Sequence, residues 1–468
     1  MMASTPTVVI AGATGFVGRA LSERLGDRYR IVGLTRAAVD PPPYPGVEWR
    51  RCDLFSLLEC EEALAGAEYA VYLVHSMLPS ARLTQGAFQD MDLIIADNFA
   101  RAAARAGVKQ IVYLGGLAPE GPALSSHLRS RLEVEETLGA HGVPVTALRA
   151  GIIVGAGGSS FEMLVRLVRR LPVVPCPQWA HSPSQPIALA DALDLLTYCL
   201  AHPSLETRHF EIGCPEVLTY RQMLERMAAI LGLRRRFVDV PLSGTLWCRR
   251  WLTLVTGAPR ELVGPLLESM QHPMIARDRR LQELARLPGL PFDAAVRAAL
   301  AEGAPCAAPQ GGRRRIPGKS WRRSDVRSVQ RIPLPQGRTA RWAAEQYSAW
   351  LPLLLRTFIR AEADADKNVR VFLHFPRISL LTHRFAQDRS EASDRQVFYI
   401  NGGLLARRVR RATQRPRLEF REVLGGSCLI VAVHDYRPTL PWPLYNLTQA
   451  RIHPWVIRRF ARHLLHVG

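Results

Sequence analysis

One glycine-rich segment, residues 12–18, constrains the fold of this chain more than any other feature. It reads Gly-Ala-Thr-Gly-Phe-Val-Gly, follows the apolar run 7–11 directly and opens a stretch with helical spacing, 18–25. In this context the first glycine permits a tight turn, the second lets the backbone approach a diphosphate, and the third lets helix and strand pack closely. The N-terminus of the helix offers free N–H groups and a favourable dipole to phosphates. The segment therefore predicts a dinucleotide-binding turn at the tip of the first strand.

Strand-like and helix-like stretches alternate after this turn. Strands are expected at 30–34, 47–52, 69–74, 110–114 and 145–148, and helices at 85–106 and 128–138. Such alternation gives a parallel sheet with helices on both faces, here a Rossmann-type doubly wound α/β fold. Residues 151–300 continue with short strands and helices, which indicates a small substrate lobe. We therefore expect one domain over residues 1–300.

The end of the second expected strand indicates which dinucleotide is bound. NAD-binding proteins place a carboxylate there to hold the ribose hydroxyls, whereas this chain has Thr35 and Arg36. A guanidinium suits a 2′-phosphate through charge-assisted, bidentate hydrogen bonds. Asp53, after the third strand, is placed to accept a hydrogen bond from the adenine amino group. The pattern favours NADP over NAD; the alternative is that Arg36 is an ordinary loop residue.

Several blocks of residues 1–300 resemble the atypical, extended-type, NmrA-like short-chain dehydrogenase/reductases. They are the glycine turn, Cys52-Asp53-Leu54, Asn98 with residues 106–114, and residues 148–155. A bacterial subgroup of NAD(P)-binding proteins with an appended C-terminal domain is more similar still, through residues 73–77, 150–161 and 186–189. Motif and resemblance together assign these residues to cofactor binding: Gly12, Thr14, Gly15, Phe16, Val17, Gly18, Thr35, Arg36, Asp53, Leu54, Val74, His75 and Arg131.

The catalytic residues that the resemblance implies are missing. The family uses a Ser, a Tyr and a Lys four residues after the Tyr, with the Tyr as proton donor. This chain has Gly115-Gly116 in place of the Ser and His127 with Arg131 in place of the Tyr and Lys. Helical spacing keeps His127 and Arg131 on one face, and imidazole titrates near neutrality. His75 ends the fourth strand beside the expected cleft.

Two functions follow, and the sequence leaves open whether the protein is an enzyme. The first is an NADPH-dependent reductase of an apolar carbonyl or quinone-like substrate, with His127 or His75 as proton donor and Arg131 on the ribose or phosphates. The second is a non-catalytic NADP-binding sensor or assembly module. Epimerase or dehydratase chemistry with a tightly held cofactor is a weaker third.

The last third of the chain has a different composition. Residues 301–320 are rich in Ala, Pro, Gly and Arg and are expected to form a linker. Residues 321–468 show one helical stretch, 339–359, several strand-like runs and a terminal helix, which predicts an α+β domain. Gly425 and Gly426 divide the last strand-like run, 418–433, by a turn. The order of these elements resembles a helix-grip lipid-binding domain, and this resemblance implies an apolar ligand.

Charge is concentrated in this last third. Residues 301–468 hold 30 Lys and Arg against 12 Asp and Glu, out of a net charge of +20 for the chain. Basic clusters occur at 313–315, 322–323 and 407–411, and the terminal segment 442–465 mixes Trp, Tyr and Arg. Such a helix favours a membrane interface or packs on the sheet of its own domain. Binding of nucleic acid by the basic clusters is a weaker alternative, because no known nucleic-acid-binding motif accompanies them.

Targeting and metal signals are missing from the sequence. No Cys or His spacing suggests a metal site, the start lacks the features of a signal peptide, and no apolar run is long enough to span a bilayer. We expect a cytoplasmic protein with peripheral contact to the inner membrane face.

Overall fold

The computed structural model describes residues 5–36, 46–75, 83–119, 124–205, 208–241, 245–258, 260–303, 325–354, 359–364, 366–390, 392–407 and 415–468. The chain divides into two compact units. Unit 1 comprises Met1–Leu78 and Phe99–Pro317, and unit 2 comprises Pro79–Asn98 and Gly318–Gly468. The division falls within helix α3 (Phe88–Ala106). Residues 79–98, which the sequence places in the first domain, therefore group with unit 2. The expected linker 301–320 lies outside the described residues beyond 303.

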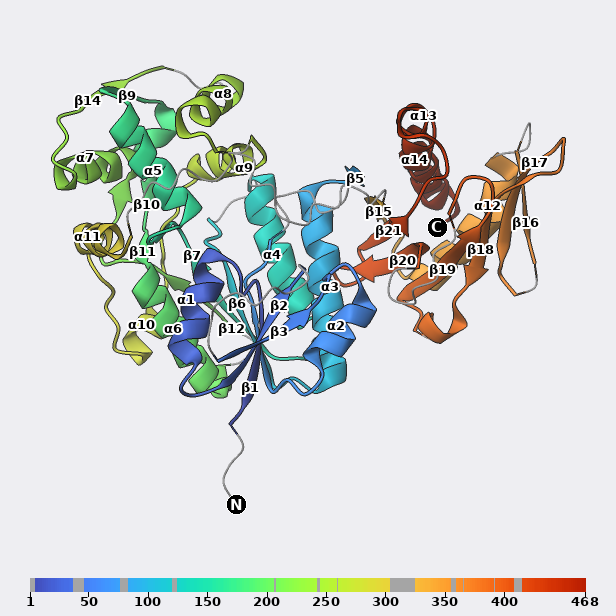
Figure 1. The fold of residues 1–468 in the computed structure, drawn as a ribbon, viewed down its shortest axis with the longest axis horizontal. Helices are drawn as coiled ribbons and strands as arrows, with labels where there is room; N and C mark the ends of the chain where they lie inside the picture. Colours follow the sequence, from blue (N-terminus) through green and yellow to red (C-terminus); the bar gives the residue numbers. More distant parts are fainter. Residues whose placement is uncertain are drawn as a thin grey trace. The chain divides into compact units, whose positions relative to one another are not determined.

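Unit 1 contains a parallel sheet, as the sequence predicts, with one strand more than the six expected (Figure 1). Its order is β12 (Arg208–Ile212), β7 (Val145–Ala150), β6 (Gln110–Gly116), β4 (Tyr69–Tyr72), β1 (Thr7–Ala11), β2 (Arg30–Thr35) and β3 (Val47–Arg51). The inner strands are short, β-branched and fully buried, which is typical of a parallel sheet covered on both faces. The chain order reverses direction between β1 and β4, and ligands of such sheets bind at this point.

Helices cover both faces of this sheet. On one face, Leu21 of α1 (Phe16–Leu25) and Leu195 of α6 (Leu189–Ala201) share a core with Ile10 and Val112. On the other face, Phe99 of α3 contacts the ring of Tyr72, with 5.1 Å between the ring centroids. The remaining helices beside this sheet are α2 (Leu57–Leu64) and α4 (Ser126–Gly139).

The expected substrate lobe follows within unit 1. Its helices are α5 (Ser159–Arg170), α7 (Tyr220–Ile230), α8 (Thr245–Thr256), α9 (Arg260–Met270), α10 (Arg280–Leu284) and α11 (Phe292–Glu302). Short strands pair as β8 (Ile153–Val154) with β11 (Ile187–Ala188), β9 (Val173–Cys176) with β14 (Arg236–Asp239), and β10 (Pro183–Ser184) with β13 (Leu218–Thr219). Most of these elements contribute to a separate apolar core.

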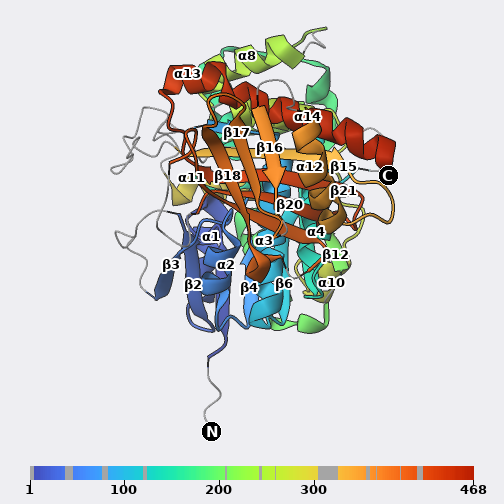
Figure 2. The ribbon, with the colours of Figure 1, turned by 90° about the vertical axis from the view of Figure 1, so that its right-hand side faces the viewer.

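Unit 2 contains an eight-stranded mixed sheet (Figure 2). Its order is β16 (Ile359–Ala363), β17 (Val369–Leu373), β18 (Ser379–Phe385), β19 (Arg395–Gly402), β20 (Arg417–Val423), β21 (Cys428–Tyr436), β15 (Val326–Pro333) and β5 (Leu83–Gln85). All neighbours are antiparallel except β15 and β5, which run parallel.

Helices α12 (Ala340–Leu354) and α14 (Gln449–Val467) pack on one face of the unit 2 sheet, and the short α13 (Trp442–Leu447) precedes α14. Tyr347 of α12 contacts Phe420 of β20 and Phe460 of α14, at centroid distances of 5.2 Å and 5.1 Å. A terminal helix on an antiparallel sheet agrees with the expected α+β class. These rings, however, occupy the space between helix and sheet in which an apolar ligand was expected.

The opposite face of the unit 2 sheet buries charged side chains. Glu419 of β20, 1% exposed, accepts hydrogen bonds from Arg395, at 2.7 Å, and from Arg421. Arg421 also donates to Asp97 of α3, at 2.6 Å. Burial alone would raise the pKa of Glu419, but Arg395 and Arg421 outweigh it and hold that pKa well below its usual range. The cluster is therefore a charged, hydrogen-bonded network.

None of the helices in the described part of the chain has the length and apolar character needed to cross a bilayer. Within that same part, no cluster of His, Cys, Asp and Glu side chains is arranged to hold a metal ion. The basic clusters 313–315 and 322–323, and cluster 407–411 apart from Arg407, lie outside the described residues.

Candidate functional site

The turn between β1 and α1, hereafter the glycine turn (residues 12–18), requires its glycines. Gly12 has a φ of +91°, and a Cβ added there would lie 3.1 Å from the carbonyl oxygen of Leu73. A Cβ at Gly18 would lie only 2.2 Å from the carbonyl oxygen of Gly12. The Gly15 N–H donates to that same oxygen at 2.8 Å. The two outer glycines thus fill the roles the sequence predicts, a tight turn and a close packing of helix on strand.

The N-terminus of α1 suits an anion. Gly15 occupies the N-cap position in an extended conformation, and the described residues place no side-chain hydrogen bond on this cap. The first turn of α1 also carries no acidic residue. Helix N-termini carry unsatisfied N–H groups and a partial positive charge. The turn therefore presents a cradle whose polarity suits a diphosphate.

A cavity of about 580 Å³ adjoins the glycine turn. It lies at the carboxyl ends of β4, β6 and β7 and beside the start of α4, so it occupies the point where the strand order reverses. Ten residues that the sequence assigns to the site line this one cavity: Gly12, Thr14, Gly15, Phe16, Val17, Gly18, Val74, His75, His127 and Arg131.

The residues expected to hold the adenosine part lie at the neighbouring strand ends, outside the lining of this cavity. Thr35 ends β2, and Arg36 follows it and is exposed. The Cys52 N–H donates to the Thr35 carbonyl at 2.9 Å, so the loop after β3 runs beside the end of β2. In that loop the Asp53 carboxylate accepts the Phe55 N–H at 3.3 Å, and Leu54 is buried. The structure thus brings these four residues to one edge of the sheet.

His127 is held as a neutral imidazole. Its Nδ1 lies 2.9 Å from the Ser269 hydroxyl, which itself donates to the Pro265 carbonyl at 3.0 Å. Because that hydroxyl hydrogen is already used, Nδ1 carries the imidazole hydrogen and donates to Ser269. Burial, followed by the charge of Arg131 and by His75, lowers the pKa of His127 to about 3. A proton donor of the expected kind would need a charged imidazole near pH 7, and the environment of His127 opposes this.

Of the two glycines in place of the family's serine, Gly115 leaves no room for a side chain, whereas Gly116 does. A Cβ at Gly115 would lie 2.7 Å from the Tyr113 ring, and one at Gly116 would lie 3.4 Å from Cγ of Arg131. Tyr113 donates its hydroxyl hydrogen to the Arg131 carbonyl at 3.3 Å. Arg131 itself is 6% exposed. The Tyr113 ring therefore occupies the space that a side chain at Gly115 would need.

The substrate lobe contributes an apolar wall that sequence reasoning missed. Besides Ser269, the cavity lining includes Ile152, Met163, Leu164, Tyr220, Leu266, Met270 and Met274. No local signal marks these residues, since they come from segments up to 256 residues beyond the glycine turn. The cavity thus combines a polar end at the turn with an apolar end in the lobe.

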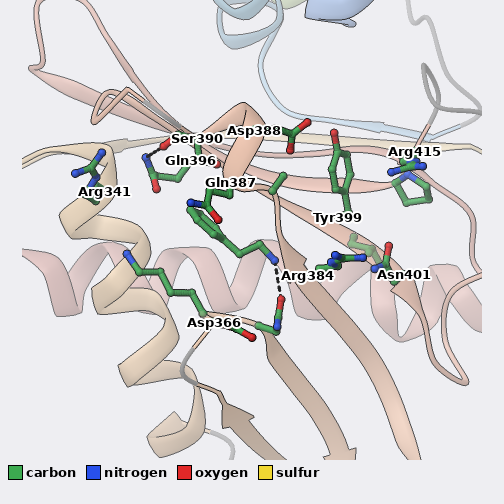
Figure 3. Close-up of a pocket in the computed structure, with 16 residues that line it drawn as sticks. Arg341, Asp366, Arg384, Gln387, Asp388, Ser390, Gln396, Tyr399, Asn401 and Arg415 are labelled. Carbon is green, nitrogen blue, oxygen red and sulfur yellow. Dashed lines mark hydrogen bonds between the residues drawn. The ribbon is translucent and has the colours of Figure 1, made fainter.

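A second cavity, of about 1760 Å³, lies in unit 2 and is polar (Figure 3). Arg341, Arg384 and Arg415 line it together with Asp366 and Asp388. The Arg415 guanidinium lies 5.4 Å from the centroid of the Tyr399 ring, which also lines the cavity. This charged lining does not suit the apolar ligand that the helix-grip resemblance implies.

The sequence of unit 1 matches a known family over its first half. Residues 8–171 match the NAD dependent epimerase/dehydratase family. This part of the chain has the Rossmann topology, and its predicted resemblance to the NAD(P)-binding short-chain dehydrogenase/reductases is confirmed as a resemblance.

Among curated proteins, the auxiliary protein GraX of Staphylococcus aureus is 34% identical over 142 residues, which cover 30% of this chain and 42% of GraX. The chain thus matches less than half the length of this relative.

Solved structures share the fold. A nucleoside-diphosphate-sugar epimerase from Staphylococcus aureus has a TM-score of 0.51 at 13% identity, covering 62% of this chain and 99% of the epimerase. The NADPH-dependent quinone oxidoreductase QOR2 from Escherichia coli, complexed with NADPH, has a TM-score of 0.50 at 19% identity, covering 62% and 99%. Triphenylmethane reductase from Citrobacter has a TM-score of 0.50 at 17% identity, covering 63% and 99%.

Proposed function

We propose that unit 1 binds NADP(H) and passes its hydride to an apolar, quinone-like acceptor. The observation that carries this proposal is the single cavity of about 580 Å³ that runs from the glycine turn to an apolar wall of the substrate lobe. Cofactor and acceptor must meet for hydride transfer, and here a diphosphate cradle and an apolar chamber are continuous.

The binding residues divide by chemistry. The glycine turn holds the diphosphate, Arg36 holds the 2′-phosphate, and Thr35, Asp53 and Leu54 surround the adenosine. Val74 and His75 at the end of β4, and Arg131 in α4, line the part of the cavity toward the lobe, where the nicotinamide and its ribose belong. The cofactor supplies the hydride; the protein positions it and excludes water with the apolar wall.

The protonation state of the site favours one class of acceptor. Reduction of a simple ketone forms an alkoxide as basic as hydroxide, so it needs a strong proton donor. Reduction of a quinone forms a phenolate, whose conjugate acid has a pKa of about 10, so a donor at the transition state is less important. His127 is neutral, and the two glycines at the serine position offer no hydroxyl. His75, exposed at the same cavity, is the residue placed to relay a proton from water.

The test is NADPH oxidation by the full chain with a short-chain benzoquinone and with an aryl ketone of similar size. We expect turnover of the quinone, and turnover of the ketone slower by about 100-fold or more, the usual worth of a general acid. A His127→Gln variant should keep quinone turnover within a few-fold. Equal rates for both acceptors would show that the site holds an effective acid, and loss of quinone turnover in the variant would show that His127 is needed; either result would contradict the proposal.

A non-catalytic NADP-binding role is the second candidate. The closed serine position at Gly115 favours it, because no catalytic hydroxyl can be restored there without moving Tyr113. In that case NADPH binds to the protein, but neither the benzoquinone nor the aryl ketone is reduced.

A further inference from the structure

Helices α13 and α14 also carry apolar side chains that the described residues of unit 2 leave exposed. Val456, Ile457, Phe460 and Leu464 of α14 are buried against the sheet of unit 2. Other side chains nevertheless remain exposed: Leu444 (48%), Leu447 (63%), Ile452 (52%), Trp455 (41%) and Leu465 (60%). Packing on the domain's own sheet, one of the two roles expected for this segment, therefore explains only half of its apolar residues.

Two neighbouring turns extend this exposed apolar surface. Phe375 is 92% exposed in the turn between β17 and β18, and Leu404 is 56% exposed in the turn after β19. The Leu404 N–H donates to the Ser379 carbonyl at 2.9 Å, which joins the two turns. The Thr439 N–H, just before α13, donates to the Leu405 carbonyl at 3.2 Å. We call Phe375, Leu404, Leu444, Leu447 and Trp455 the apolar rim of unit 2.

Basic side chains outnumber acidic ones around the rim, where the exposed Glu362 carboxylate beside the Phe375 turn pairs with Arg377 at 3.0 Å. No Asp or Glu follows Asp435 in the sequence. Arg451, Arg458, Arg459 and Arg462 are exposed on α14, and Arg407 is exposed after Leu404. The Arg459 guanidinium lies 5.7 Å from the centroid of the Trp455 ring. Arginine beside Trp and Leu on a helix surface matches the boundary between anionic headgroups and acyl chains.

We propose that this rim docks the protein on an anionic lipid bilayer, with Phe375, Leu444 and Trp455 entering the acyl boundary and the arginines of α14 on the lipid phosphates. A bilayer accepts apolar side chains that project singly from turns, because acyl chains rearrange around them. A protein partner would need a matching pocket for each. The proposal is independent of the chemistry in unit 1.

The test is flotation of the full chain with vesicles of phosphatidylcholine alone and with about a third phosphatidylglycerol. We expect binding only to the anionic vesicles. An Arg458→Gln/Arg459→Gln double variant should bind about 25-fold more weakly, since each arginine near such a surface contributes about fivefold. Phe375→Ser should bind about tenfold more weakly, through loss of one buried aromatic ring.

A matched control keeps the result specific. Leu254 is 82% exposed on α8 of unit 1, so Leu254→Ser should leave vesicle binding unchanged. An unaltered unfolding transition in each variant shows that the chain remains folded. Absence of binding to anionic vesicles overturns the proposal. Binding to heparin in solution that exceeds vesicle binding and ignores Phe375→Ser would also overturn it, because the partner would then be an acidic macromolecule.

Discussion

At the scale of single residues, Arg36 is the side chain that should select the dinucleotide. It is exposed at the end of β2, where a carboxylate would favour NAD. An Arg36→Glu variant should lose about tenfold or more in NADP affinity, because a charge-assisted contact is replaced by repulsion, and should keep or gain NAD affinity.

Titration of both nucleotides by fluorescence checks the role of Arg36. Arg28, exposed in the segment before β2, provides the control, since Arg28→Glu makes the same charge change before rather than after this strand. If both variants lost NADP affinity equally, the loss would come from the change in net charge. Arg36 would then make no specific contact with the 2′-phosphate.

Glu419 tests how far a buried charge depends on its partners. Arg395 and Arg421 both donate to this carboxylate, which is 1% exposed. Glu419→Gln should cost about 3–5 kcal/mol of unfolding free energy, because it leaves buried guanidinium groups uncompensated. Urea unfolding measures this cost. Glu362→Gln, which removes an exposed ion pair with Arg377, should cost less than about 1 kcal/mol. Similar costs for the two variants would mean that the cluster is not held as an ionic network.

At the scale of elements, strand β5 comes from an early part of the chain but belongs to the sheet of unit 2. Leu83–Gln85 pairs in parallel with β15, some 240 residues later in the sequence, and Gly86 then turns into α3. Gly86 has a φ of +143°, and a Cβ there would lie 2.3 Å from the Val329 carbonyl oxygen.

Gly86→Ala should therefore destabilise unit 2 by about 2 kcal/mol or more, through backbone strain and steric conflict together. Gly337→Ala, at a φ of +74° with no atom within 4 Å of the added Cβ, isolates the backbone strain and should cost only about 1 kcal/mol. Chemical unfolding of both variants compares the two. An equal cost would show that β5 does not approach β15 this closely.

The elements also show what local sequence patterns can predict. The glycine turn, β1 and the turn at Gly425 and Gly426 follow from spacing alone, and the structure confirms them, with φ of +61° and +81° at these two glycines. The helix expected over 339–359 ends at Leu354, and the strand β16 from Ile359 was missed because it lies at a sheet edge with only five residues. Likewise Ser269 and Tyr220 reach the site through packing of the lobe, which leaves no periodic trace in the sequence.

At the scale of the whole molecule, stability should depend on pH through buried histidines. Burial lowers the pKa of His383 to about 4, and burial together with His383 lowers that of His453 to about 4. The unfolded chain has a histidine pKa of about 6.5, so it binds more protons than the folded chain between the two values. The free energy of unfolding therefore has its full value above a pH of about 6.5. It falls as the pH drops toward 4, by about 3 kcal/mol for each histidine.

The urea midpoint at several pH values checks this dependence. His383→Gln should flatten it, whereas His466→Gln, at an exposed position of α14, should not. A pH dependence that is the same in the His383 variant would place the acid sensitivity elsewhere.

The central claim is that the glycine turn grips a diphosphate, and calorimetric titration of the full chain with NADP tests it most directly. Gly15 is the N-cap of α1 with a φ that any residue adopts, and Asp and Asn cap helices equally well. Gly15→Asp and Gly15→Asn therefore differ only in a negative charge placed where the phosphates bind. We expect wild-type binding, weaker binding by the Asn variant and no measurable binding by the Asp variant. Failure of the wild-type chain to bind either pyridine nucleotide, or equal binding by the two variants, would contradict the account.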